Sequence, residues 1–355
     1  MGPFGRRGVH LALALVAAGC VPGAAGDPAP GTAHATAGAG APVTTASARR
    51  TGEAARAPEG AASGSATAAA PRPTASAGAP DRARPSVEAY PWLADATLAV
   101  PPAVDTVAGR FAPPPGFERL PLEADSFGAW LRALPLAAAG TPVVSFDGTT
   151  LHEASDPRIA AVAALDVGKA DLQQCADAIM RLWGEWSWAR GVRDLRYRLA
   201  NGQELPYQRY QRGERVVSEG RSIRWEARAK ATAPDDHRAF RAYLDQVFMF
   251  ANTGSLAKQA RPVGVDALRP GDFVIQPGAP GHAVLVLDLA RAADGRRAVL
   301  LGQSYMPAQS FQVLRPAPAH AALRDSAWFA VDPDGPGLTT PFWPTFAWSA
   351  LRRLD

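Results

Sequence analysis

Three residues have side chains that together could hydrolyse an amide bond: Cys175, His282 and Gln303. A thiolate is a nucleophile, and an imidazole can take the thiol proton and later return it to the leaving amine. A carboxamide can accept a hydrogen bond from the imidazole and fix its orientation. Cys175 is the only cysteine after Cys20, in the stretch "DLQQCADAIMRLWGEW". The three residues are therefore candidates for a single nucleophilic site.

The cysteine is expected at the beginning of a helix that spans about residues 172–188. Asp171 and Gln174 fit a capping box that would begin this helix. Near the positive end of a helix dipole the pKa of a thiol falls, which favours the thiolate. The same capping box would bond the N–H of Cys175 to the Asp171 carbonyl, so this N–H could not serve an oxyanion. Gln173 and Gln174 are then the candidate oxyanion donors.

A structural interpretation of Cys175 stays open. The cysteine shares one apolar helical stripe with other large residues and could simply pack in the core. The stripe consists of Leu172, Cys175, Ile179, Leu182 and Trp186.

His282 and Gln303 are expected on two neighbouring strands, "HAVLVLDLA" and "RAVLLGQSY". A tight turn on Asp294-Gly295 would pair Gln303 with Val286, four residues from His282, whereas a loop over residues 290–295 would pair it with His282 itself. Both registers keep the two side chains on the same face, so the hydrophobic pattern cannot choose between them.

The remaining elements predict an α+β domain. A short helix is expected in "DSFGAWLRALPL", a hairpin around Asn201-Gly202, and a second long helix in "DDHRAFRAYLDQVFMFANTGSL". A run of antiparallel strands follows the helices. The sequence thus predicts helices packed on an antiparallel sheet in a single domain, residues 90–355.

Several of these segments resemble known families. "GHAVLVLD" with "LLGQSY" resembles the histidine strand and the Asn-Ser-Trp strand end of papain-like peptidases, and "LRPGDFVI" before "GHAVLVLD" resembles NlpC-type cell-wall endopeptidases. "DVGKADLQQCADAIMRL", "PGHAVLVLDLA" and "QSYMPAQ" resemble an uncharacterised bacterial family, domain of unknown function 4846. The first two likenesses imply a papain-like fold with Cys175, His282 and Gln303 as the triad. The third names no activity.

The first twenty residues read as a signal peptide with a lipobox. Arg6 and Arg7 precede the short apolar stretch "VHLALALVAAG", which is too short to span a bilayer, and Cys20 follows. The resemblance to bacterial lipoproteins implies cleavage before Cys20 and a lipid on its sulfur. Val21 resembles the signal for the outer membrane, facing the periplasm. An ordinary secretory signal is the alternative. A lipidated Cys20 would leave Cys175 without a disulfide partner.

Residues 21–89 are expected to form a disordered tether. They are rich in Ala, Pro, Gly, Ser and Thr, and residues 21–87 contain no Leu, Ile, Phe, Met or Trp. Such a segment buries too little apolar surface to offset its ordering entropy.

Other partners find little support in the sequence. The net charge of +4 comes from scattered arginines. Without a basic run interleaved with aromatics, nucleic-acid binding is not predicted. His152, His237 and His320 show no paired spacing with cysteines or carboxylates, so no metal and no other cofactor is predicted.

The sequence therefore predicts a lipid-anchored envelope protein. Its expected activity is that of a cysteine hydrolase, which cleaves amide bonds through a thioester on Cys175, with cell-wall peptides as the expected substrate. The substrate class is inferred from the resemblance in fold and from the predicted cellular location. The alternatives are a catalytically inactive envelope binding module with the same fold and a structural envelope protein without a cleft.

Overall fold

The computed structural model of the protein describes residues 86–355, apart from residues 221, 229–232, 318–322 and 324–325. The predicted signal peptide, Cys20 and nearly all of the predicted tether lie outside the described residues. Tyr90 and Trp92 are the first of the described residues that are buried in the core.

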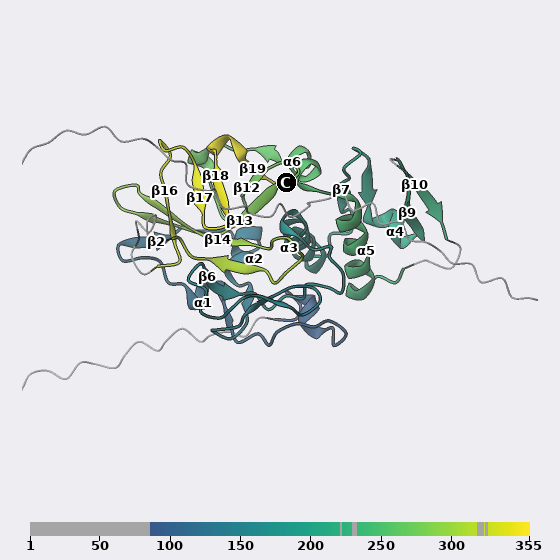
Figure 1. Cartoon of the computed structure of the whole chain (residues 1–355), viewed down its shortest axis with the longest axis horizontal. Helices are drawn as coiled ribbons and strands as arrows, with labels where there is room; N and C mark the ends of the chain where they lie inside the picture. The colour runs from purple at the N-terminus through teal and green to yellow at the C-terminus, as the bar shows by residue number, and fades with distance from the viewer. Residues whose placement is uncertain (1–85, 221, 229–232, 318–322, 324–325) are drawn as a thin grey trace, which may run out of the picture. The chain divides into compact units, whose positions relative to one another are not determined.

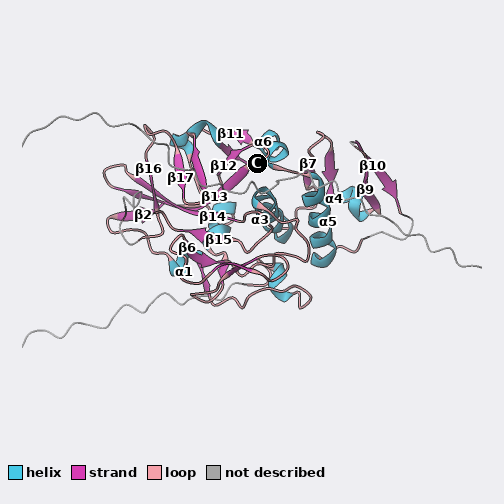
Figure 2. Ribbon diagram, viewed as in Figure 1, coloured by secondary structure: helices cyan, strands magenta, loops and turns pink. Residues whose placement is uncertain are grey.

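A nine-stranded sheet forms the centre of the domain, and every strand pair that it contains is antiparallel (Figure 2). Its main path runs through β11 (Arg261–Pro262), β19 (Leu351–Arg353), β12 (Phe273–Gln276), β13 (His282–Ala292), β14 (Arg297–Gln303), β15 (Gln312–Leu314) and β6 (Ile159–Val162). Off this path, β2 (Phe117–Arg119) pairs with β13 and β16 (Phe329–Val331) with β14.

Helices pack against this sheet, which confirms the predicted α+β class. Those in contact with its strands are α2 (Phe127–Arg132), α3 (Cys175–Ala189) and α6 (Thr253–Gln259). The helices α4 (Tyr207–Gln211) and α5 (His237–Phe250) contact each other, α5 also contacts α3, and α1 (Val107–Arg110) contacts α2. In Figure 1, α3 lies between the large sheet and α5, in agreement with its contacts to β13, β14 and α5. The described residues also contain the short 3-10 helices η1 (Pro91–Ala94), η2 (Val265–Ala267) and η4 (Trp348–Ala350).

The described residues also form five two-stranded antiparallel sheets separate from the large one. They are β1 (Asp105–Thr106) with β3 (Pro135–Leu136), β4 (Val143–Val144) with β5 (Thr150–His152), β7 (Arg196–Arg198) with β8 (Glu204–Pro206), β9 (Glu214–Glu219) with β10 (Ser222–Ala227), and β17 (Leu338–Thr340) with β18 (Trp343–Phe346). The predicted turn at Asn201-Gly202 does join β7 to β8, and Gly202 has the positive φ of +89° that this turn requires.

The two faces of the large sheet belong to different apolar clusters. Side chains of a strand alternate between faces. Along β13, Ala283 and Leu285 join the cluster that contains α3, whereas Val284 and Val286 join the cluster that contains Phe346 of β18. His282 has the same parity as Val284. Its side chain therefore belongs to the face that packs against β18.

Buried ion pairs fix the helices to the sheet. Asp288, fully buried on β13, accepts hydrogen bonds from Arg119 at 2.7 Å and from Arg132 of α2 at 2.6 Å. Arg181 of α3 is also fully buried and pairs with Asp166. Removing one partner of such a pair leaves an uncompensated buried charge, which typically costs about 3–5 kcal/mol.

Candidate active site

Helix α3 begins at Cys175, three residues later than the sequence predicts. Gln174 is the N-cap, and its N–H donates to the Asp177 carboxylate at 3.1 Å. The first helical backbone bond runs from Ala178 N–H to the Gln174 carbonyl at 3.0 Å. Among the described residues no backbone carbonyl accepts from the Cys175 N–H. The predicted capping box on Asp171 is therefore wrong, and the obstacle that it raised to an oxyanion hole disappears.

His282 and Gln303 are in direct contact. The Nε2–H of His282 donates to Gln303 Oε1 at 2.8 Å, and both side chains are buried. The amide oxygen sets the tautomer, so Nδ1 is left unprotonated and is a hydrogen-bond acceptor. Nδ1 has no hydrogen-bond partner among the described residues.

The strand register that joins them is neither of the two predicted ones. Leu285 pairs with Gly302, which places Gln303 opposite Val284 and diagonal to His282. The turn is a loop of residues 293–295, closed by the Ala292 N–H on the Arg296 carbonyl at 2.9 Å, and an irregularity between Val286 and Asp288 shifts the register once more. Diagonal neighbours on one face remain within reach of long side chains.

The sulfur of Cys175 lies against the main chain beside His282. It is 3.9 Å from the Gly281 carbonyl oxygen, which accepts a weak hydrogen bond from the thiol. The imidazole is on the sheet face that packs against β18, whereas α3 packs against the other face. Neither imidazole nitrogen forms a hydrogen bond with the sulfur in the described part of the chain. Of the three predicted residues, His282 and Gln303 are thus in contact. Cys175 contacts only the backbone of Gly281, the residue before His282.

Burial keeps both groups of the pair neutral. It raises the pKa of the Cys175 thiol to about 12, and the charge of Asp177 adds to this, while the N–H groups of Ala176 and Ala283 oppose it. Burial also lowers the pKa of His282 to about 4, against the opposing effect of the hydrogen bond that the ring donates to Gln303. In this closed state the site holds a thiol and a neutral imidazole rather than an ion pair.

Aromatic residues of the β17–β18 hairpin, together with Tyr305 just after β14, cover the imidazole. The ring of His282 lies 4.7 Å from that of Tyr305, 5.0 Å from that of Trp343 and 6.1 Å from that of Phe346, between centroids. The indole N–H of Trp343 donates to Gln276 at 3.1 Å, which ties β18 to β12. Trp343 and Phe346 were not among the predicted site residues, although they lie in the unusually aromatic stretch "PFWPTFAW".

The two predicted oxyanion donors have other partners. Gln173 is buried; its amide donates to the Asp166 carbonyl at 3.0 Å and accepts from Arg181 at 2.6 Å. The amide of Gln174 donates to Asp171 at 2.9 Å. Gln173 therefore belongs to the ion-pair cluster around Asp166 and Arg181, and neither glutamine amide is free to serve as an oxyanion donor.

Asp177 is a titratable residue at the site that the sequence analysis did not identify. It is buried, two residues after the cysteine, and its Oδ1 has no partner in the described chain. Burial raises its pKa to about 8. The only signal for it in the sequence is an acidic residue in the first turn of a predicted helix.

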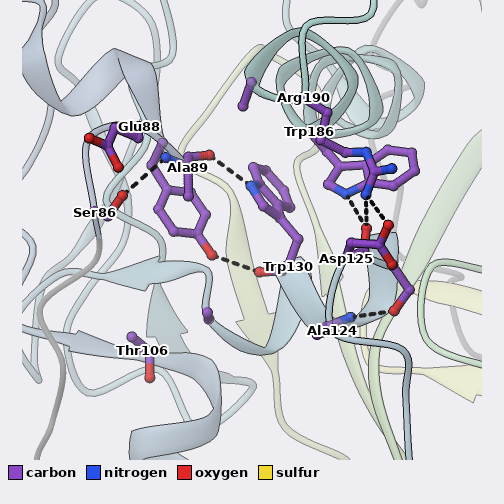
Figure 3. A pocket seen from close by; sticks show the side chains of 14 residues that line it. Ser86, Glu88, Ala89, Thr106, Ala124, Asp125, Trp130, Trp186 and Arg190 are labelled. Carbon is purple, nitrogen blue, oxygen red and sulfur yellow. Dashed lines mark hydrogen bonds and ion pairs between the residues drawn. The ribbon is translucent and has the colours of Figure 1, made fainter.

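Two cavities open near these elements. The larger, about 510 Å³, lies between the residues around Tyr90, α2 and the end of α3 (Figure 3). Several polar groups that line it form hydrogen bonds with one another. Trp130 donates to the Ala89 carbonyl at 2.8 Å, and Arg190 and Trp186 both donate to the carbonyl of Asp125. The second, about 360 Å³, lies beside the loop before His282.

Comparison with known proteins gives a family for the chain. A family model described as domain of unknown function 4846 matches residues 107–353. The chain belongs to this family. No curated protein and no solved structure matches it. The match of the DUF4846 model covers α3, β13 and β14, and therefore all the candidate catalytic residues.

The described part of this DUF4846 chain has neither a metal-binding cluster nor a membrane-spanning helix. No cluster of three or more His, Cys, Asp or Glu side chains there is arranged to hold a metal ion. Within the same residues, no helix has the length and apolar character needed to cross a bilayer.

Proposed function

We propose that this DUF4846 protein is a cysteine hydrolase that cleaves amide bonds through a thioester on Cys175, with a papain-like fold. One observation carries the proposal. Gln303 holds Nε2 of His282 at 2.8 Å and leaves Nδ1 as an acceptor without a partner in the described chain, while the sulfur of Cys175 contacts the carbonyl of Gly281, the residue before His282. This division of the two ring nitrogens is the one that a thiol–imidazole–amide triad requires.

Orphaned polar atoms support a site at this point. His282 Nδ1, Gln303 Nε2 and Gln312 Nε2 are all buried without a hydrogen-bond partner, and Gln303 and Gln312 are paired across β14 and β15. Each such atom typically costs about 1–3 kcal/mol, so native proteins contain few of them. Two of these atoms belong to the contacting pair His282 and Gln303, which supports a functional role for this pair.

The proposed reaction has two stages. The S–H proton of Cys175 passes to Nδ1 of His282, and the thiolate attacks the carbonyl carbon while the Cys175 N–H donates to the oxyanion. The C–N bond then breaks, and the imidazolium gives its proton to the leaving amine. Water, deprotonated by His282, attacks the thioester, breaks the C–S bond and releases the carboxylic acid.

The first stage requires the imidazole to move from the β18 face, around the start of β13, to the sulfur on the face covered by α3. Trp343 and Phe346 cover the ring, so we propose that substrate displaces the β17–β18 hairpin and hydrates the imidazole. Hydration would raise the depressed pKa of His282 and lower that of Cys175, since burial causes both shifts. Catalytic groups often align only once the substrate is bound.

The substrate class follows from the predicted location. The N-terminal sequence indicates export and a lipid on Cys20, which would hold the protein at the outer membrane, facing the periplasm. Cell-wall peptides are the abundant amide polymers there. We therefore propose cell-wall peptide as the substrate and the membrane anchor as the partner.

A binding module without catalysis is the second candidate, and the burial of the site favours it. Cys175 is 4% exposed and His282 is fully buried. In that case, the hairpin over His282 would stay closed and the thiol would only fill space.

Release of new amino groups from purified peptidoglycan fragments separates the two candidates. The hydrolase proposal predicts release by the full-length protein and none by Cys175→Ala, with circular dichroism showing that the variant is folded. Equal release by both proteins, or none by either, would favour the binding module.

A further inference from the structure

The smaller cavity lies close to the thiol. It is lined by residues of the β7–β8 turn, α6 and the loop before β13, among them Arg198, Gly202, Gly254, Lys258, Gly278 and Ala279. We name it the Arg198–Lys258 pocket. Ala279 is two residues from Gly281, whose carbonyl is 3.9 Å from the sulfur of Cys175. Two peptide steps span at most about 7.6 Å between Cα atoms, so this wall of the pocket lies within a distance on the order of 10 Å of the sulfur.

The loop is held closely against α6 at this point. A Cβ added to Gly281 would lie 2.5 Å from the hydroxyl oxygen of Thr253, so the glycine allows the two segments to approach. The wall of the pocket and the carbonyl against the sulfur therefore belong to the same short segment. A peptide bound in the pocket would therefore need only a few residues to extend from there to the thiol.

The charge of the pocket is positive and uncompensated. Arg198 and Lys258 line it, and no Asp or Glu of the described chain does. No ion pair or side-chain hydrogen bond of the described residues involves either cation, and Arg198 Nε is buried without a partner. A guanidinium so placed matches the two oxygens of a carboxylate, and a second cation adds attraction.

The larger cavity lacks this property, because the Arg190 guanidinium on its wall is already paired with Asp125 at 3.0 Å. We propose that the Arg198–Lys258 pocket binds a carboxylate of the substrate, about three residues from the bond that is cleaved. This inference rests on the proposed hydrolase function for its substrate. At about 3.3–3.6 Å per residue, an extended chain of three residues covers the distance from the sulfur to the pocket.

Calorimetric titration of the full-length Cys175→Ala protein tests the pocket without relying on catalysis. The probes are N-acetyl-trialanine with a free carboxylate, the same peptide with a C-terminal carboxamide, and inorganic phosphate. We expect the carboxylate peptide to bind at least 10-fold more tightly than the carboxamide. Arg198→Gln and Lys258→Gln should each weaken it at least 5-fold.

The matched control is Arg196→Gln, which removes an exposed cation from the same strand, outside the pocket. It should leave binding unchanged. Equal binding of acid and amide, no binding, or equal losses in Arg196→Gln and Arg198→Gln would overturn the proposal. Tighter binding of phosphate than of the peptide would also overturn it, since the site would then be one for phosphate. Carboxylate binding that depends on Arg198 would stand even if the protein proved unable to cleave amides.

Discussion

Gln303 reaches His282 diagonally across β13 and β14, with 2.8 Å between the amide oxygen and the ring nitrogen, although Val284 is the residue directly opposite. The contact exists because the turn and the irregularity after Val286 together place the amide two residues from the imidazole. A long side chain is needed to bridge this offset. Gln, rather than a shorter amide, suits this register.

Replacement of Gln303 tests this geometry. Gln303→Ala should lower kcat on a cell-wall peptide roughly 10–100-fold, because the imidazole loses the acceptor that fixes its tautomer. Gln303→Asn should be nearly as impaired, since its side chain is one methylene too short. Gln246→Ala, which removes an amide of α5 that bonds to the backbone of Val216, is the control. Equal kcat values for Gln303→Asn and the parent protein would contradict a role for the diagonal contact.

The buried imidazole should make the protein sensitive to mild acid. The pKa of His282 is lowered to about 4 from an ordinary value of 6.5, so the unfolded chain binds a proton that the folded one does not. The free energy of unfolding should therefore fall as the pH drops from 6.5 towards 4, by about 2–3 kcal/mol from this residue. Urea unfolding at pH 6.5 and 4.5 measures it. His282→Gln should show a smaller fall; an identical fall would contradict the depressed pKa.

Asp177 should act in the opposite direction. Burial raises its pKa to about 8, so the folded protein retains a proton that the unfolded chain releases above its ordinary value of 3.8. Stability from this residue is lost as the pH rises from 3.8 to 8. Asp177→Asn can still accept from the Gln174 N–H. We expect it to raise the free energy of unfolding at pH 8 by about 2–4 kcal/mol.

The same substitution should make the thiol more reactive. The charge of Asp177 is the second cause of the high pKa of Cys175, after burial. The pH profile of Cys175 alkylation by iodoacetamide should therefore move to lower pH in Asp177→Asn. An unmoved profile would show that Asp177 carries no charge beside the sulfur.

Trp343 should control access to the imidazole. Trp343→Ala removes a ring 5.0 Å from His282 and the indole bond to Gln276. The pKa of His282, followed by NMR, should rise from about 4 towards 6.5 because water reaches the ring. Trp348→Ala, which instead loses a bond to the Asp332 carbonyl, should leave it unchanged. Equal shifts in both variants would mean general loosening of the C-terminal segment rather than removal of a cover.

The predictable parts of the fold were those with local signals. The Asn201-Gly202 turn, the helix that begins near His237 and the strand after Gly281 could all be predicted because turn residues and apolar periodicity mark them. The start of α3 could not, since both Asp171 and Gln174 are capable caps. The choice between them depends on tertiary contacts, including the Asp171 carboxylate accepting from the Ala308 N–H at 2.6 Å.

The candidate site was predictable in its residues but not in its geometry. Cys175, His282 and Gln303 stand out by type and order. The register of β13 and β14 depends on an irregularity that no local pattern marks, and the aromatic cover comes from a hairpin some 60 residues after His282. The partners of Gln173 depend on a buried ion cluster, which side-chain chemistry alone does not reveal.

The central claim is that an acyl group becomes attached to Cys175. Intact-protein mass spectrometry after acid quenching of a reaction with peptidoglycan fragments tests it most directly, with His282→Ala included because slow deacylation should let the thioester accumulate. We predict an adduct with the mass of an acyl fragment on Cys175, absent from Cys175→Ala and sensitive to hydroxylamine. Amide cleavage without any such adduct, or an adduct that persists in Cys175→Ala, would contradict the proposal.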